Sequence, residues 1–187
     1  MKKETKKQLL IGAALVLELL FLLLYLNGRI DRLLDSDMSS EMILGQLLAR
    51  NNGILSDQWY YSTELRVLNT QLIYALFFRL SSNWHFVRMA STLVLWCVLI
   101  ASYGVLCRVM GCKKSFGVTA LLLAAPVSES YFRFVLAGVY YVPHLAIAFA
   151  ALALNEAYFK AKPDRKKFWL VVSVPVSYTH LTLPTNS

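Results

Sequence analysis

Three carboxylates lie close together in the segment DSDMSSE, residues 35–41: Asp35, Asp37 and Glu41. A carboxylate held at the boundary between water and lipid can take a proton from a hydroxyl or amide nucleophile. Partial burial suits this role, because it moves the carboxyl pKa toward the pH of the reaction. The same residues also suit a structural role, since an aspartate before a helix caps the first turn and is favoured by the helix dipole. The segment therefore predicts either a general base or a helix cap.

Aromatic residues gather in a second segment, WYYSTELRVLNTQ, residues 59–71. Trp59, Tyr60 and Tyr61 are suited to anchoring a chain at a membrane interface, and also to stacking against sugar rings. Polar side chains then enter an apolar helix within two turns: Glu64, Arg66, Asn69 and Gln71. Because polar groups at membrane depth need a partner or a cavity, these residues are candidates for substrate binding, and we expect Glu41 to bind substrate with them. The planar guanidinium of Arg66 fits a phosphate or pyrophosphate.

Long apolar blocks surround these two segments. Residues 9–26 are interrupted only by Glu18, and a helix of that length nearly crosses a hydrocarbon core of roughly 30 Å. No small-residue cleavage site follows, so we expect an uncleaved anchor. Residues 89–106, 116–136 and 142–159 are each long enough for a further span, and another starts at Phe168.

Basic residues flank the apolar blocks and predict the topology. They are Lys2, Lys3, Lys6 and Lys7, then Arg108, Lys113 and Lys114, then five more between Lys160 and Lys167. Four spans place all three groups on the cytoplasmic side, as the positive-inside rule requires. A fifth span over residues 65–80 would move the 160–167 group outside. We therefore expect an interfacial or re-entrant helix at 65–80.

Composition supports a membrane protein over a nucleic-acid-binding one. Hydrophobic residues make up 57% and charged residues 16% of the 187 residues, where a soluble domain carries about 25% charged residues. The net charge of +8 lies beside the apolar spans, and no soluble basic face is visible for RNA or DNA. Cys97, Cys107 and Cys112 lack the spacing of a disulfide framework or a metal site. We expect a multi-pass protein of the inner (plasma) membrane with a cytoplasmic amino terminus.

The predicted fold is all-α: the amino-terminal fragment of a polytopic transmembrane helical bundle. Its expected parts are a basic cytoplasmic tail (1–8), a transmembrane anchor (9–26), an extracytoplasmic loop (27–88), a transmembrane region (89–175) and a tail (176–187). Within the loop, Ile43, Leu44, Leu47 and Leu48 form one stripe, which predicts an amphipathic surface helix over residues 38–50. The tail VSYTHLTLPTNS resembles translated sequencing-adaptor DNA. We expect it to be non-native and the natural protein to continue past Pro175.

The order of these features resembles the opening of C-type (GT-C) membrane glycosyltransferases, which include the dolichyl-phosphate-mannose–protein mannosyltransferases. The resemblance covers roughly residues 1 to 160. It implies a sugar donor on a polyprenyl phosphate, inversion at the anomeric carbon, and a catalytic aspartate in the first outer loop. Asp37 matches that position, because Glu41 and Gly45 then fall at the spacing of the family's following residues, and Asp35 is the alternative.

The chain departs from that family at two points. Met38 stands where the acidic partner of the aspartate would be, and no proline pair precedes residue 72. The resemblance also implies a full span at residues 65–80, in contrast to the charge pattern. No cofactor is implied with certainty, and either Arg66 or a divalent cation would stabilise the leaving phosphate.

Two further interpretations remain. The chain can be a non-enzymatic membrane protein, such as a carrier of lipid-linked oligosaccharide or a component of polymer export. That interpretation requires charges along the spans and discontinuous helices near the midplane, and Glu18 is the charge that falls at the middle of a predicted span. The chain can also be an assembly or scaffold subunit. The expected partners of the enzyme are a polyprenyl-phosphate-linked sugar and membrane lipid, and the missing later spans predict that this chain by itself is inactive.

Overall fold

The structure is a computed structural model that describes residues 3–61, 69–162, 164, 166, 168 and 169. Within these ranges every regular element is helical, as predicted. The long helices are α1 (Lys3–Asn27), α4 (Trp84–Met110) and α7 (Val142–Lys160). The shorter elements are η1 (Ile30–Leu33), α2 (Ser36–Asn51), α3 (Thr70–Phe78), α5 (Phe116–Ala124), α6 (Glu129–Tyr131) and the π-helix η2 (Phe132–Ala137).

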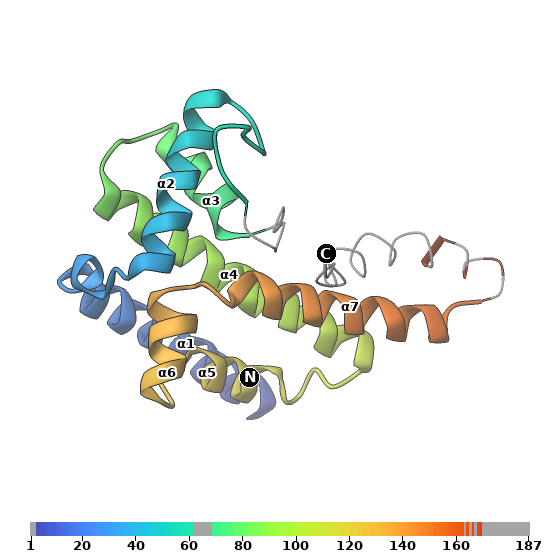
Figure 1. Cartoon of the computed structure of the whole chain (residues 1–187). Helices are drawn as coiled ribbons and strands as arrows, with labels where there is room; N and C mark the ends of the chain where they lie inside the picture. The colour runs from blue at the N-terminus through green and yellow to red at the C-terminus, as the bar shows by residue number, and fades with distance from the viewer. Residues whose placement is uncertain (1–2, 62–68, 163, 165, 167, 170–187) are drawn as a thin grey trace.

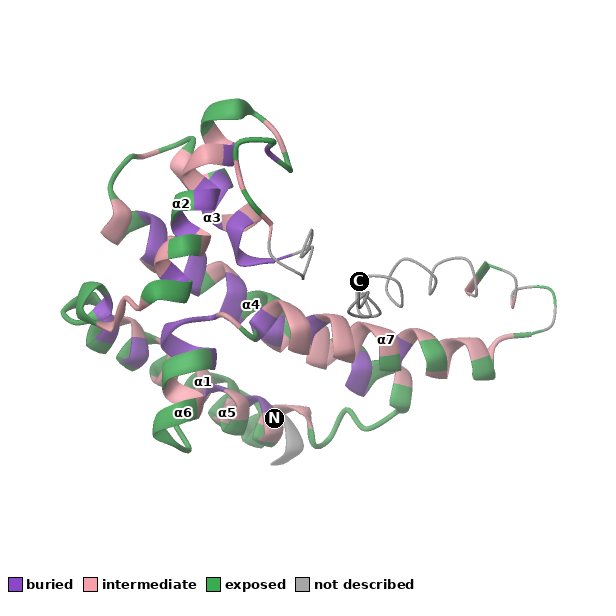
Figure 2. Cartoon of the chain, viewed as in Figure 1, coloured by how far each residue is buried: buried purple, intermediate pink, exposed green. Residues whose placement is uncertain are grey.

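Three helices are long and apolar enough to cross a membrane: residues 6–27 of α1, α4 and α7. By length and composition, these helices confirm the prediction of several apolar spans. Helix α4 begins at Trp84, five residues before the predicted start, and ends at Met110. The exposed apolar side chains on the outside of these helices fit a lipid or protein environment, since soluble proteins rarely expose such continuous apolar surface (Figure 2).

The predicted span over residues 116–136 is divided into two parts that are bent by 87° relative to each other. The break follows from Pro126, which disfavours helical backbone at the preceding residue, and Ala125 is extended with φ −73° and ψ 136°. Ser128 then starts the next helix by accepting a hydrogen bond of 3.1 Å from the Tyr131 N–H. This segment therefore forms one broken span or a re-entrant loop.

Side-chain contacts set the direction of each helix. His85, at the start of α4, contacts Asp31 and Asn27 just where α1 ends, so α1 and α4 are antiparallel. At the other end of the bundle, Ile11 of α1 lies against Gly117, shortly after α4 ends. Helix α7 runs alongside α4 in the same direction, as Figure 1 shows. The segment between α4 and α7 must therefore lead back from one end of the bundle to the other.

The main core lies where the second half of α1, the middle of α4 and the η2 segment meet. Leu22 and Leu26 of α1 pack with Leu95, Trp96 and Leu99 of α4 and with the η2 segment around Leu136. The indole N–H of Trp96 donates to the Leu136 carbonyl at 3.0 Å, which gives a partner to a backbone group of the π-helix. Buried polar backbone groups need such partners, so this bond fixes the bent segment against α4.

Helices α2 and α3 form a separate pair that packs on the start of α4 (Figure 1). The two helices approach each other closely at Gly45, where an added Cβ would lie 2.7 Å from the Tyr74 Cβ. Leu44 and Leu48 are buried as the predicted stripe requires, whereas Ile43 is 48% exposed. The buried face of α2 is continued by Met38 and Met42, because α3 and α4 cover that side.

Helix α3 is too short to cross a membrane. The backbone of Asn69 is extended, with φ −138° and ψ −177°, so the helix begins only at Thr70, and it ends at Phe78. Nine helical residues rise about 14 Å, roughly half of a hydrocarbon core. Of the region 65–80, only residues 69–80 lie within the described structure. This part agrees with the interfacial or re-entrant helix that the charge pattern predicts.

Candidate functional site at the α2–α3 end of the bundle

Asp35 caps helix α2. Its Oδ1 accepts a hydrogen bond of 2.9 Å from the Met38 N–H, and its backbone is extended as a capping residue requires. The Ser39 hydroxyl donates to the Asp35 carbonyl at 2.6 Å. The first of these bonds gives a partner to a backbone N–H that the start of a helix otherwise leaves unpaired. The structural role proposed for this aspartate from sequence is therefore present.

Asp37 lies in the first turn of the same helix and is exposed. No hydrogen bond joins its carboxylate to another described residue, in contrast to Asp35. An acidic side chain in the first helical turn interacts favourably with the helix dipole. Of the two aspartates, Asp37 is therefore the one with a carboxylate accessible to a reaction partner.

Glu41 and Asn69, both predicted to bind substrate, contact each other. The two Glu41 carboxylate oxygens accept from the Asn69 side-chain amide at 3.2 Å and from the Thr70 hydroxyl at 3.0 Å. Asn69 is only 4% exposed, and its Oδ1 has no hydrogen-bond partner among the described residues. The cluster joins the middle of α2 to the start of α3. In the sequence, Glu41 is 28 positions from Asn69 and 29 positions from Thr70. It fixes the position of the helix pair that carries Asp37.

The three predicted aromatic residues divide into two groups. Trp59 and Tyr61 pack partly buried against Leu48 and its neighbours between α2 and α3, and the Tyr61 hydroxyl accepts from the Ser56 N–H at 3.0 Å. Tyr60, by contrast, is 92% exposed. It is therefore the aromatic side chain of this group that is open to a sugar ring or to lipid. Glu64 and Arg66 lie outside the described residues.

Arg88 is a buried cation that sequence reasoning missed. It is 2% exposed, donates from Nη1 to the Ile30 carbonyl, and has Nη2 at 3.3 Å from the Met38 sulfur. It also lies in the electrostatic field of Asp31 and Asp35. The sequence WHFVR, residues 84–88, could have indicated this role. Polar residues at the beginning of an apolar span require partners.

Tyr74 lies beside Arg88 in the same cluster and is 2% exposed. Its burial raises the pKa of its hydroxyl to about 12, because the charged phenolate is poorly solvated there. Glu41 and Asp35 raise this pKa further, whereas the positive charge of Arg88 lowers it. The region thus contains a buried tyrosine and a buried cation, and the cation contacts Met38, the residue after Asp37.

The acids of this region are not arranged as a metal site. Asp31 contacts His85 at 2.8 Å, Asp35 caps α2 and Glu41 is bound to Asn69 and Thr70. Among the residues that the structure describes, no three His, Cys, Asp or Glu side chains lie close enough to hold an ion. The described residues therefore do not fit a divalent cation at this place.

A shallow pocket of about 180 Å³ opens on the opposite half of the α2–α3 pair. Gln46 and Arg50 of α2 line it, together with Phe78 and Ser82. Arg50 lies thirteen residues after Asp37, which corresponds to about 20 Å along a helix. This pocket is therefore separate from the carboxylate of Asp37.

Comparison with known proteins gives no family assignment. No family model matches the chain, and neither the curated proteins nor the solved structures contain a significant match.

Proposed function

We propose that this chain is part of a membrane glycosyltransferase that moves a sugar from a polyprenyl phosphate to a cell-envelope acceptor. The observation that carries the proposal is the position of Asp37. Its carboxylate is exposed on a helix pair held by the Glu41–Asn69–Thr70 bonds and by Arg88. A base must be accessible to its substrate and held by rigid surroundings, and Asp37 has both properties.

The proposed orientation places this end of the bundle outside the cell. Basic side chains gather at the opposite end: Lys6, Lys7, Arg108, Lys113, Lys114 and Lys160. Basic flanks are retained on the cytoplasmic side during insertion. The amino terminus is then cytoplasmic, the protein lies in the inner membrane, and Asp37 faces the compartment in which envelope polymers are assembled.

In the proposed reaction, Asp37 takes the proton from the acceptor hydroxyl or amide. The acceptor atom then attacks the anomeric carbon, and the bond from that carbon to the phosphate oxygen breaks with its electron pair leaving on the polyprenyl phosphate. Attack from the opposite face inverts the anomeric centre. Arg66 remains the proposed partner of the leaving phosphate, since Arg88 is turned inward toward Ile30 and Met38. Asp35 is the alternative base.

The test replaces each aspartate in the full-length protein and measures sugar transfer from a polyprenyl-phosphate donor. Loss of a general base lowers the rate by about 10²- to 10⁴-fold, which is the result expected for Asp37→Asn. Asp35→Asn is the matched comparison, because asparagine caps a helix as well as aspartate does, so loss of transfer in this variant instead of in Asp37→Asn would assign the base to Asp35. Unchanged transfer by Asp37→Asn would exclude Asp37 as the base.

One observation favours the alternative function, a carrier of lipid-linked oligosaccharide. Carriers commonly use discontinuous helices, and the segment from α5 to η2 is broken at residues 125–128 with Glu129 exposed directly after the break. Purified full-length protein in vesicles distinguishes the two. A carrier moves the lipid-linked sugar across the membrane unchanged, whereas an enzyme converts it to polyprenyl phosphate and a glycosylated acceptor.

A further inference from the structure

A pocket of about 330 Å³ lies at the basic end of the bundle, between the last turns of α4 and the start of α5. Its walls include Gly104, Val105 and Phe116, and its cationic groups are Arg108 and Lys113. Gly104 allows the close approach of the Phe116 ring, since a Cβ there would lie 3.2 Å from that ring. The pocket therefore combines an apolar wall with two positive charges.

Neither of these charges is neutralised within the described part of the chain. Arg108 and Lys113 have no acidic partner there, although a third basic residue at this end does. Lys160 contacts Glu156 at 2.9 Å and donates to the Val109 carbonyl at 2.8 Å. Two cations beside one pocket favour an anionic ligand, and a guanidinium fits a phosphate through two parallel hydrogen bonds.

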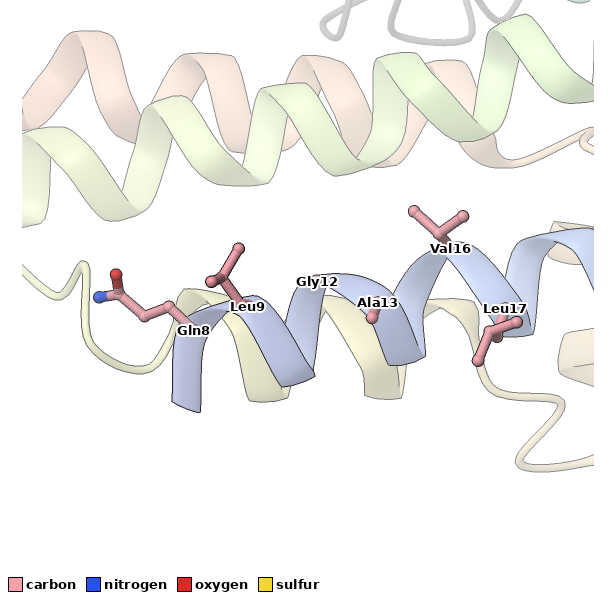
Figure 3. Close-up of a pocket in the computed structure, with 6 residues that line it drawn as sticks. All are labelled: Gln8, Leu9, Gly12, Ala13, Val16 and Leu17. Carbon is pink, nitrogen blue, oxygen red and sulfur yellow. The ribbon is translucent and has the colours of Figure 1, made fainter. Parts of the chain in front are cut away.

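A second feature at this end favours a lipid over a free anion. An apolar groove of about 780 Å³ runs along α1, lined by Leu9, Gly12, Ala13, Val16 and Leu17, with Gln8 at its end. In Figure 3, Leu9 and Val16 extend from α1 toward α4. Ile11 of α1 lies against Gly117, the residue after Phe116 of the basic pocket, so the α1 helix that carries the groove contacts the start of α5. An acyl chain and a charged headgroup thus both find a complementary surface.

We infer that the pocket at Arg108 and Lys113 binds the phosphate of an anionic phospholipid headgroup. Basic pockets between spans are suited to such headgroups, because the helix ends lie at headgroup depth. This lipid differs from the sugar donor of the proposed reaction, which would be used at the opposite end of the bundle. The inference does not depend on the proposed enzymatic activity.

The experiment uses the 187-residue chain in detergent micelles and counts lipids retained in native mass spectra. The probes are phosphatidylglycerol, phosphatidylcholine and inorganic phosphate. The test variant is Arg108→Gln with Lys113→Gln. The matched control is Lys6→Gln with Lys114→Gln, which removes the same charge at the same end without altering the pocket lining. Arg108→Lys with Lys113→Arg keeps both charges and reports whether the fold tolerates exchange at these positions.

The wild-type chain is expected to retain phosphatidylglycerol in preference to phosphatidylcholine. The test variant should weaken that binding about 30-fold, because each basic residue near an anionic headgroup contributes about fivefold. The control variant should weaken it much less, and the charge-preserving variant should bind as the wild type does. Equal losses in the test and control variants would overturn the inference in favour of general attraction to a basic surface. Displacement of the lipid by equimolar inorganic phosphate would overturn the assignment to a lipid.

Discussion

The Lys160 ammonium donates to the Val109 carbonyl at 2.8 Å, which places the carboxyl-terminal ends of α4 and α7 side by side. Closer to the other end, the Tyr103 and Phe149 rings lie 5.3 Å apart. The two helices are therefore parallel along their length. Two parallel helices joined by one segment require that segment to lead back along the bundle, which favours a broken span over a re-entrant loop for the bent α5–η2 segment.

This topology predicts that Asp37 and Cys112 lie on opposite sides of the membrane. Cys112 is exposed in the loop after α4, and Cys97 and Cys107 would be replaced by alanine. In intact cells, a membrane-impermeant maleimide should label an Asp37→Cys variant that lacks the other cysteines. It should label Cys112 only after the membrane is permeabilised. Labelling of both positions from one side would contradict the bundle described above, and the reverse pattern would overturn the proposed orientation.

Close packing at Gly45 predicts a large effect of a small substitution. In Gly45→Ala the new methyl group would meet the Tyr74 Cβ at 2.7 Å and the Gln71 carbonyl at 3.0 Å. Overpacking of this kind costs about 1–3 kcal/mol, so the free energy of unfolding should fall by that amount. The measurement is loss of far-UV circular dichroism during titration with denaturing detergent. Gly12→Ala is the control, because nothing lies within 4 Å of its added methyl group. It should be neutral or stabilising.

The buried hydroxyl of Tyr74 predicts a loss of stability at alkaline pH. Its pKa is about 12 in the folded chain and about 10 in an unfolded one. Between these values the unfolded chain has lost a proton that the folded chain retains, so the free energy of unfolding falls as pH rises from 10 to 12. Below pH 10 this group contributes no pH dependence. The full effect is about 2–3 kcal/mol.

Unfolding of the wild type and of Tyr74→Phe at pH 9 and pH 11.5 measures this effect. The variant lacks the titrating hydroxyl and should lose less stability across the interval than the wild type does. Tyr60→Phe, at a position that is 92% exposed, should behave as the wild type. Identical pH dependence in Tyr74→Phe and the wild type would show that Tyr74 does not titrate as its burial requires.

Apolar composition was sufficient to predict α1, α4 and α7, because a hydrocarbon core demands about 20 apolar residues. Composition did not predict the break at residues 125–128, since Ala125, Pro126 and Val127 are all apolar. The break depends on the backbone restriction that proline imposes. The predicted start of the span, residue 89, is five residues later than the observed start of α4, because the polar residues His85 and Arg88 favour a loop in the sequence. Their long-range partners, Asp31 and Ile30, make these polar groups compatible with a helix.

The candidate site was predictable in its residue types and less so in its contacts. Helix-cap chemistry at Asp35 follows from local sequence. The contact of Glu41 with Asn69 depends on how α3 packs against α2, and that is determined by Gly45 and Tyr74 rather than by either polar residue. Arg88 was missed for the same reason, because its partners Ile30 and Met38 are 58 and 50 positions away.

Arg88 should contribute more to stability than an exposed arginine does. In Arg88→Met, the Ile30 carbonyl loses its donor, and an unsatisfied buried acceptor costs about 1–3 kcal/mol. Loss of the positive charge should also raise the pKa of Tyr74 further, since Arg88 lowers it. Arg79→Met is the control at an exposed position, and should change the free energy of unfolding by less than about 0.5 kcal/mol. Equal stability of both variants would contradict the role of Arg88.

The two aspartates at the start of α2 should separate stability from function. Asp35→Ala removes the cap on the Met38 N–H and should cost about 1 kcal/mol, whereas Asp35→Asn should cost little. Asp37→Asn leaves every hydrogen bond described for α2 in place, and loses only its attraction to the helix dipole, worth about 0.3–1 kcal/mol. Denaturing-detergent titrations of the three variants give these differences. If Asp37→Asn cost clearly more than about 1 kcal/mol, beyond the helix-dipole contribution, the Asp37 carboxylate would have a structural partner, and its availability as a base would be lost.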